Sequence, residues 1–299
     1  MFVTPRQLAQ ATGLSESTIK RWCDRGLLPS QRTPGGHRRL KLAEVVAILR
    51  SRSVPVVDAL ALGLPPFEEL ARDGLAGARQ ALLDALIHAD RHRVNAILHA
   101  LVLGGISIAT IGDAVISPVF AQIGEWWACR EIEVFQEREA CLIAEEALRE
   151  LKHFFPPPAL GAPLGIGGTL TGDWYILPGL LVELVLMAHR WEARFLGTNL
   201  PAHTCAEAIR RIRPELFWLS LSHVASAEEV VEATKQLAEV AQDVHTLVVV
   251  GGRELAGELE SRIFASACCR NLAQLELLLR TLPITGRRSA EPPNIKPPT

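Results

Sequence analysis

Two groups of side chains in this sequence have the types and spacing needed for recognition chemistry. The first group lies within residues 1–53 and combines hydroxyl, ammonium, guanidinium and imidazole groups. Guanidinium groups match the acceptor edge of guanine, hydroxyls bond to several bases, and cationic groups bind phosphate. We therefore expect eight residues to bind double-stranded DNA: Ser17, Thr18, Lys20, Arg21, Arg32, His37, Arg38 and Arg39.

The charge of the chain supports this expectation. Residues 1–52 carry ten Lys and Arg against three acidic residues, whereas the whole chain has a net charge of −2. The remainder is therefore acidic, which indicates that only the N-terminal part meets a polyanion. A solvated basic surface on an unrelated small domain is the alternative, but the local elements described next all agree with DNA binding.

Three helices and a hairpin are expected to position these side chains. Thr4 and Gln7 form a capping box at the first helix, and Ser15 caps the second. The run Pro34-Gly35-Gly36 forces a tight reversal with basic residues on both sides. The expected order is a helix at 4–12, a helix at 16–25, a hairpin at 31–39 and a helix from 41 to about 53. This order makes residues 1–53 a winged helix-turn-helix.

The next part of the chain has helical periodicity. Residues 54–73 hold three prolines, and we interpret them as a linker with one short helical piece. Helices expected at 75–87, 91–103, 107–126 and 133–151 are separated by short breaks. Residues 74–155 are therefore predicted to form a four-helix bundle, closed by a run of three prolines.

Strands and helices alternate from about residue 160. Strands are expected at 164–169, 191–196, 216–220, 246–250 and about 264–267, with helices at 176–188, 206–212, 227–241, 253–261 and 272–282. This alternation predicts a parallel, doubly wound α/β sheet in residues 156–283, whose ligands lie beyond the carboxyl ends of the strands. Residues 284–299 are rich in proline, and we expect a disordered tail. The chain is thus α+β and multidomain.

The N-terminal segment resembles the MerR family of transcription regulators. The resemblance rests on residues 14–22, on Gly26-Leu27-Leu28, and on the run Arg32-Thr33-Pro34-Gly35-Gly36-His37-Arg38. It implies a dimer bound to a partly palindromic promoter. Pro55 cuts short the long helix through which many members dimerise, so we expect a homodimer or higher oligomer built through the C-terminal part.

The bundle and the α/β part resemble the CarH/LitR branch of that family, which senses light through a Rossmann-like cobalamin-binding module. Trp127 and Glu137 fit the branch's Trp, nine residues, Glu-His signature, and Asp173 fits its Asp-x-His-x-x-Gly signature. Residues 196–201, Ser220-Leu221-Ser222 and Gly251-Gly252 stand where the family cradles the nucleotide tail of the cofactor.

Three positions tied to the metal depart from that pattern. Arg138 replaces a His of the first signature, and Tyr175 and Pro178 replace the ligand His and the Gly of the second. A phenol with a pKa near 10 is a poor substitute for imidazole on cobalt. We therefore expect no His-ligated cobalamin and no metal site.

The second group of side chains lines the predicted ligand site between bundle and sheet. Aromatic rings offer stacking surface, Ser and His offer short polar contacts, and Gly permits close backbone approach. The expected ligand-binding residues are Trp126, Trp127, Glu137, Arg138, Asp173, Trp174, Tyr175, His203, Ser220, Ser222, His223, Gly251 and Gly252.

Three interpretations of this site stay open. The site could hold another flat, conjugated molecule, such as a bilin or a haem-like tetrapyrrole, attached covalently at Cys129, Cys141 or Cys205 if any thiol reacts. The module could instead lack a ligand and serve only for oligomerisation, its aromatic residues being core. Cobalamin bound without a protein imidazole ranks third.

Other function classes fit less well. No catalytic domain is left once the three parts are assigned, and Gly165-Ile166-Gly167-Gly168 lacks the dinucleotide-binding pattern, so we expect a regulator and no enzyme. A purely structural DNA-bound scaffold would show no ligand-dependent change in DNA affinity. The six cysteines include no CxxC pair, and we see no signal peptide and no membrane span, which together predict a cytoplasmic protein.

Overall fold

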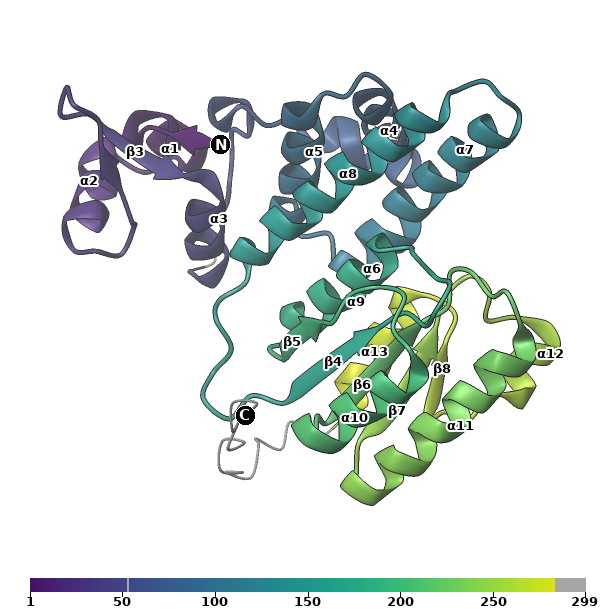
Figure 1. Ribbon diagram of the computed structural model, residues 1–299. Coiled ribbons are helices and arrows are strands. Elements are labelled where there is room, and N and C mark those ends of the chain that lie inside the picture. Colours follow the sequence, from purple (N-terminus) through teal and green to yellow (C-terminus); the bar gives the residue numbers. More distant parts are fainter. Residues whose placement is uncertain (53, 283–299) are drawn as a thin grey trace. The chain divides into compact units, whose positions relative to one another are not determined.

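The computed structural model describes residues 1–52 and 54–282, and these form two compact units (Figure 1). The first unit is Met1–Pro156 and the second is Pro157–Thr299. Among the described residues, no helix combines the length and the hydropathy needed to cross a bilayer.

The first 51 residues of the first unit form the winged helix-turn-helix, which we call the head. Its elements are β1 (Phe2–Val3), α1 (Pro5–Thr12), α2 (Glu16–Asp24), β2 (Gln31–Arg32), β3 (Arg38–Lys41) and α3 (Leu42–Ser51). The capping box of Thr4 and Gln7 forms as expected from the sequence. Strand β1 was not expected, because two residues are too short to show a period. It pairs with β3 and makes the order β1-β3-β2, with both pairs antiparallel.

The sequence predicts residues 54–73 to be a linker with one short helical piece. They contain a 3₁₀ turn, η1 (Leu60–Leu62), and the first turns of the next helix. The segment is fastened to α1, since Val57 N donates to Ala11 O at 2.7 Å and Gln10 Nε2 donates to Asp58 Oδ2 at 3.0 Å. Leu62 and Leu64 are buried. The segment therefore contributes two leucines to the core of the first unit.

The bundle of the first unit follows this segment. It contains α4 (Phe67–Ile87), α5 (Arg91–Leu103), α6 (Ile108–Ile111), the π-helical turn η2 (Gly112–Ile116), α7 (Ser117–Ala128), α8 (Val134–Leu151) and the 3₁₀ turn η3 (Lys152–Phe154). Non-helical backbone at residues 72–75 bends α4. The single helix expected at 107–126 is divided among α6, η2 and α7, because the π turn shifts the backbone pairing at Gly112.

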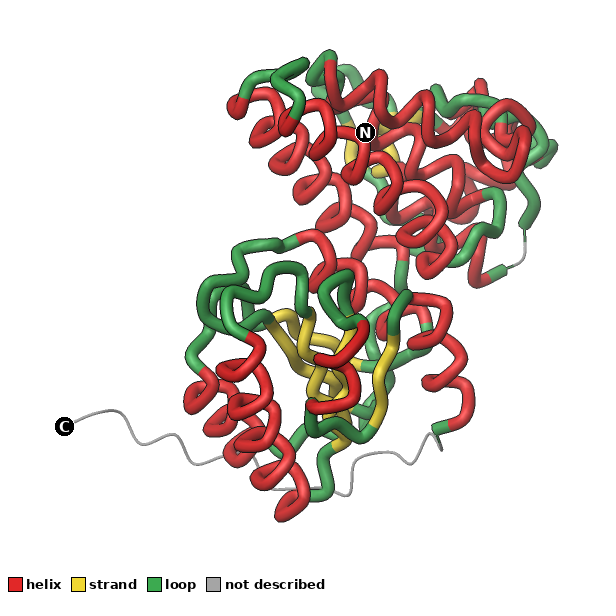
Figure 2. Tube along the Cα trace, turned by 90° about the vertical axis from the view of Figure 1, so that its right-hand side faces the viewer, coloured by secondary structure: helices red, strands yellow, loops and turns green. Residues whose placement is uncertain are grey.

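The second unit is a doubly wound parallel sheet. Its strands are β4 (Leu164–Gly168), β5 (Glu192–Phe195), β6 (Leu216–Ser220), β7 (Leu247–Gly251) and β8 (Ala267–Cys269). Their order is β5-β4-β6-β7-β8, and every pair is parallel. Figure 2 shows the strands enclosed between helices. The helices are α9 (Leu177–Ala188), α10 (Ala202–Ile212), α11 (Ala227–Val244), α12 (Gly257–Arg262) and α13 (Leu272–Thr281).

The core of the second unit lies on both faces of the sheet. Alternate residues Leu164 and Ile166 of β4 pack with Phe217 of β6 and with α10 and α11 on one face. The intervening glycines of β4 lie on the opposite face, where Gly167 makes room for the buried indole of Trp218. A sheet buried on both faces is the normal state of parallel strands.

Two elements of the second unit depart from the sequence prediction. The last strand lies at Ala267–Cys269 instead of about 264–267, because Phe264 is exposed and Cys269 takes the buried position. Helix α12 begins at Gly257 instead of residue 253, since the loop after β7 occupies 252–256. The expected disordered tail, 284–299, lies outside the described residues.

Candidate DNA-binding and ligand-binding sites

Helix α2 presents the first set of predicted residues. Ser15 caps it by accepting a hydrogen bond from Thr18 N at 3.1 Å, which fixes where the helix begins. Ile19 points into the core of the head and is fully buried. The opposite face is therefore solvent-exposed, and it carries Ser17, Lys20 and Arg21. Helical periodicity explains this division.

The polar side chains at the start of α2 are already ordered. The hydroxyl oxygens of Ser17 and Thr18 each lie 2.9 Å from Ser15 Oγ. Lys20 Nζ pairs with Glu16 Oε1 at 2.8 Å, and the pair lowers the pKa of the Glu16 carboxyl. An exposed i,i+4 pair of this kind is weak, so Lys20 can exchange it for a phosphate.

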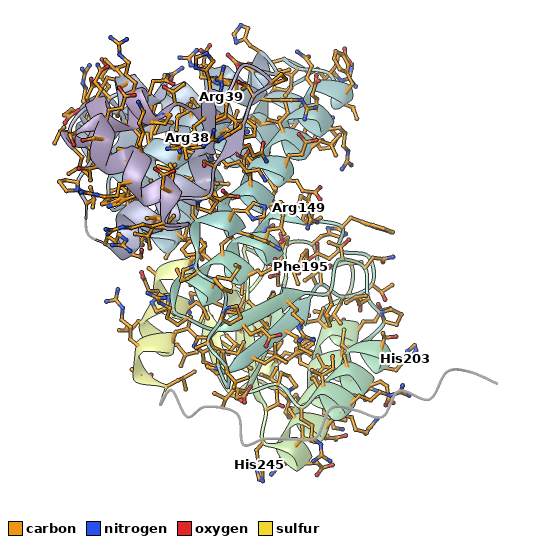
Figure 3. All side chains as sticks on the ribbon, turned by 90° about the vertical axis from the view of Figure 1, so that its left-hand side faces the viewer. Arg38, Arg39, Arg149, Phe195, His203 and His245 are labelled. Carbon is orange, nitrogen blue, oxygen red and sulfur yellow. The ribbon has the colours of Figure 1, made fainter. Side chains whose placement is uncertain are left out.

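The basic residues of the hairpin have two different environments. Arg38 is only 16% exposed: its Nη2 lies 2.5 Å from Asp24 Oδ1, and its Nη1 donates to Lys20 O at 3.2 Å. It therefore fastens β3 to α2, which the sequence did not reveal. Arg39, its neighbour on β3, points the other way and is exposed (Figure 3). Arg32 and Arg39 help to line a surface hollow of about 200 Å³, and His37 is exposed at the hairpin tip.

The predicted residues of the bundle lie at the end of α7 and the start of α8. Trp126 is half-buried, whereas Trp127 is 50% exposed. Glu137 Oε1 accepts a hydrogen bond from Cys141 Sγ at 3.3 Å, and its other oxygen lies 3.4 Å from Arg138 Nε. Burial, aided by Glu137, raises the pKa of the Cys141 thiol to about 12. This thiol is therefore a poor nucleophile.

The end of α7 and the following helix α8 carry exposed apolar side chains besides Trp127. Val134, Phe135 and Leu142 of α8 are each more than half exposed. Phe135 and Leu142 are seven residues apart and thus share one face of the helix. We call these four residues the bundle-end patch.

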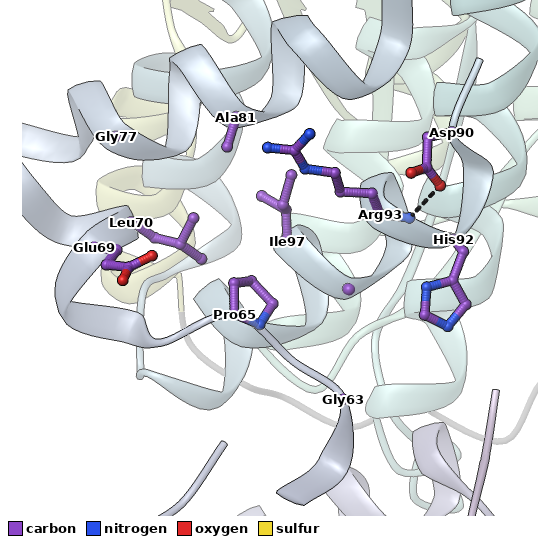
Figure 4. Close-up of a pocket in the computed structure, with 11 residues that line it drawn as sticks. Gly63, Pro65, Glu69, Leu70, Gly77, Ala81, Asp90, His92, Arg93 and Ile97 are labelled. Carbon is purple, nitrogen blue, oxygen red and sulfur yellow. Dashed lines mark hydrogen bonds between the residues drawn. The ribbon is translucent and has the colours of Figure 1, made fainter. Parts of the chain in front are cut away.

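A cavity of about 370 Å³ lies elsewhere in the first unit, between residues 63–70, α4 and α5 (Figure 4). Two of its charged residues, Asp90 and Arg93, are engaged within the bundle. Asp90 caps α5 by accepting from Arg93 N at 2.9 Å, and Arg93 Nη1 pairs with Asp84 at 2.5 Å. None of the predicted site residues lines it.

The carboxyl edge of the sheet in the second unit is organised by Asp173. This residue is 1% exposed. Its Oδ2 accepts from Ser222 N at 2.7 Å and His223 N at 3.2 Å, and its Oδ1 accepts from Tyr175 N at 3.0 Å. The carboxylate thus ties the loop after β4 to the loop after β6. Asp173, which the sequence predicts as a ligand-binding residue, has its carboxylate engaged by three backbone N–H groups in this structure.

The loop residues beside Asp173 are arranged differently. Trp174 is 67% exposed and Tyr175 is 46% exposed, so both rings are accessible. Pro178, which stands in place of the family's Gly, lies in the first turn of α9, where proline is favoured. The guanidinium carbon of Arg253 lies 4.9 Å from the centroid of the Tyr175 ring. Arg253 was missed, although a long cation directly after Gly251-Gly252 was the available signal.

The predicted glycines and serines of this edge face protein. A Cβ on Gly251 would lie 2.5 Å from Cys269 O, and one on Gly252 would lie 2.2 Å from Leu221 O. Ser220 and Ser222 are each 3% exposed. Gly252 has a φ of +127°, which favours glycine. These residues therefore help to shape the loops at the carboxyl edge, and their expected role in cradling a ligand stays a prediction.

The two predicted histidines lie on exposed positions. His203 belongs to the first turn of α10, and Figure 3 shows it at the surface of the second unit. His223 donates its backbone N–H to Asp173, and its imidazole is exposed. Neither imidazole is buried beside the aromatic pair of the β4 loop.

Comparison with known proteins agrees with this architecture. Residues 2–53 match the helix-turn-helix domain family, and residues 78–152 match the B12 binding domain family. The HTH-type transcriptional repressor CarH of Myxococcus xanthus is 26% identical over 253 residues, which span 77% of this chain and 82% of CarH. The monomethylamine corrinoid protein of Methanosarcina barkeri superposes with a TM-score of 0.55 at 18% identity, covering 67% of this chain and 96% of that protein. The latter likeness concerns the fold.

These findings define a DNA-binding transcription regulator that carries a B12 binding domain. Within that class, the two domain matches and the CarH relative make the chain similar to CarH-type regulators. The relative CarH is named as a transcriptional repressor, which agrees with a regulator.

The residues of the second unit differ from those expected to hold the cobalamin that this class implies. The loop after β4 offers a phenol in place of an imidazole, and the guanidinium of Arg253 lies over one face of that ring. The glycine positions of the β7 loop are filled by backbone of β8 and of the β6 loop. The donor set and the filled cradle do not fit a cobalamin held by a protein imidazole.

Proposed function

We propose that the head binds promoter DNA through α2 and the hairpin, and that the second unit senses a planar conjugated ligand without an imidazole-held cobalt. The exposed basic face of α2 carries the first half of this proposal. Ile19 anchors the helix in the head, so that Ser17 and Arg21 point outward in the geometry of a recognition helix. Arg32, His37 and Arg39 then contact phosphates, while Arg38 keeps the hairpin at a fixed position against α2.

The sensing half rests on the accessible aromatic rings. Trp174 and Tyr175 at the carboxyl edge of the second unit, and Trp127 in the bundle, are each about half or more exposed. Large aromatic side chains at such exposure favour a stacking partner. A bilin or another conjugated tetrapyrrole meets this need, and light is the signal if the bound molecule absorbs in the visible range.

A second candidate function is assembly without a ligand. The bundle-end patch favours it, since four exposed apolar side chains, one on α7 and three on α8, suit a homodimer or a higher oligomer. In both versions a change in assembly alters promoter occupancy through avidity.

DNA binding is tested with Arg21→Ala, Arg39→Ala and the control Arg211→Ala, an exposed arginine of α10. Gel shifts use the DNA upstream of the chain's own gene and random-sequence DNA at several salt concentrations. We expect Arg21→Ala to relax the preference for the specific DNA. Arg39→Ala should weaken binding to both DNAs. It should also lower the steepness of log K against log salt concentration by about 1. Wild-type affinity in both variants would contradict the proposed docking.

Sensing is tested by the visible spectrum of the purified chain mixed with aquocobalamin, adenosylcobalamin or biliverdin. We expect a retained band with biliverdin and no cobalamin band characteristic of imidazole ligation. A cobalamin that stays bound with such a band would overturn the ligand assignment. The absence of every band would leave assembly as the function of the module.

A further inference from the structure

Three loops of the carboxyl edge meet at one side chain, Arg253. Its Nε donates to Ser222 O in the β6 loop at 2.9 Å, and its guanidinium lies over the Tyr175 ring of the β4 loop. Arg253 itself belongs to the loop after β7. Two contacts from different loops therefore fix the plane of the guanidinium.

The two Nη atoms of that guanidinium are available to a ligand. The hydrogen bond to Ser222 O and the 3.6 Å approach to Glu254 Oε1 both involve Nε. Neither Nη atom makes a hydrogen bond to any residue in 1–52 or 54–282. Two parallel N–H donors in one plane match the two oxygens of a carboxylate or a phosphate.

The charges around Arg253 favour an anion. The nearest buried carboxylate, Asp173, is fully engaged by three backbone N–H groups. Glu254 is exposed, and its pair with Nε is long, so solvent screens it. The exposed imidazole of His223 adds a further donor in the adjoining loop. Beside them, Trp174 offers an exposed indole for stacking.

We propose that the carboxyl edge of the second unit recognises an acidic planar ligand, whose carboxylate or phosphate binds the two Nη atoms of Arg253. This inference rests on the proposed function and names the chemistry of its ligand. The Tyr175 ring holds the guanidinium in place, which lowers the entropy lost on binding. Arg253 is thus a specificity residue that rejects the uncharged form of the same ring system.

The test compares two matched pairs of conjugated molecules with the full-length chain. The pairs are biliverdin with its dimethyl ester, and flavin mononucleotide with riboflavin, which differ in carboxylates and in phosphate respectively. Binding is followed by quenching of tryptophan fluorescence and by equilibrium dialysis. The variants are Arg253→Gln, Arg253→Lys and the control Arg211→Gln, with circular dichroism to establish that each is folded.

We expect the acidic member of at least one pair to bind about tenfold more tightly than its neutral partner. Arg253→Gln should bring the two within about twofold, and Arg253→Lys should keep part of the preference because it keeps the charge without the fork. Arg211→Gln should behave as wild type. The pair whose acidic member binds more tightly identifies the recognised group as carboxylate or phosphate.

The inference is overturned if neither pair shows a preference for its acidic member, if none of the four molecules binds, or if the preference survives in Arg253→Gln. Failure of the proposed function has a different signature. Retention of an imidazole-ligated cobalamin would remove that function while leaving the acid-against-neutral comparison to decide the role of Arg253.

Discussion

At the scale of single residues, His99 of α5 is the least compensated polar group in the described part of the first unit. It is fully buried, and neither ring nitrogen has a hydrogen-bond partner among the described residues. Phe154 packs on it at 4.6 Å between ring centroids. Glu150 Oε1, 4.0 Å from Nε2, favours protonation, but burial outweighs it and lowers the pKa of His99 to about 4. The Met1 ammonium and His92 act in the same direction as burial.

This pKa predicts acid sensitivity of the first unit. The unfolded chain takes up a proton on His99 near pH 6.5, whereas the folded chain does so only near pH 4. The free energy of unfolding should therefore fall as the pH is lowered between these values, by on the order of 3 kcal/mol for a complete shift. Replacing the imidazole by His99→Leu should flatten this dependence in urea unfolding followed by circular dichroism. His203→Gln, at an exposed position, serves as control; an unchanged slope in His99→Leu would refute the assignment.

The cysteines give a second prediction at this scale. Burial raises the pKa of the Cys205 and Cys269 thiols to about 11 and that of Cys141 to about 12. At pH 8 about one in a thousand of these thiols, or fewer, is ionised. Cys129 is exposed at the end of α7, so it should carry the fast phase of labelling by an aromatic disulfide reagent.

Cys129→Ser should abolish that fast phase, and Cys205→Ser should leave it intact. Rapid labelling that persists in Cys129→Ser would show a different reactive thiol. A covalently attached ligand would accordingly be lost in Cys129→Ser and retained in Cys205→Ser.

At the scale of elements, the approach of α9 to β5 depends on a glycine. A Cβ on Gly179 would lie 2.2 Å from the ring of Phe195, which Figure 3 marks on the second unit. Gly179→Ala should destabilise the second unit by about 1–3 kcal/mol through overpacking. The double variant Gly179→Ala/Phe195→Leu should recover part of this loss in thermal unfolding.

A matched substitution separates crowding from helix propensity. Gly124 lies inside α7 with no neighbouring atom within 4 Å of its added Cβ. Gly124→Ala should therefore be neutral or stabilising by up to about 1 kcal/mol. If Gly179→Ala and Gly124→Ala changed the stability equally, the contact with Phe195 would have no influence on that stability.

The sequence predicted elements well where periodicity and caps agree. Thr4 with Gln7, and Ser15, marked the starts of α1 and α2, and the alternation after residue 160 gave the parallel sheet. It could not predict which polar groups pair across distant segments. The pair of Arg38 with Asp24, the three bonds of Asp173 and the stacking of Arg253 on Tyr175 depend on loops meeting in space. Local patterns carry no record of such contacts.

At the scale of the whole molecule, the bundle-end patch predicts self-association. Phe135 is 66% exposed on α8, and burial of such a ring favours an oligomer. Phe135→Ser should lower the molar mass measured by light scattering after gel filtration. It should also flatten the DNA-binding curve, because paired heads bind more tightly than single ones. The control Leu277→Ser changes a residue of similar exposure on α13 and should keep the molar mass of the wild type. If Leu277→Ser lowered the molar mass as well, the effect would come from surface hydrophobicity in general.

The attachment of residues 57–64 to α1 has a practical consequence for anyone exchanging parts between regulators. The bonds from Val57 to Ala11 and from Gln10 to Asp58 would be cut by a chimera joined at residue 53. A graft that carries residues 1–156 together keeps those bonds and the leucines beneath them. Transplanting a foreign sensory part should therefore succeed at the junction after Pro156 and yield a misfolded recombinant when the junction is placed directly after the third helix.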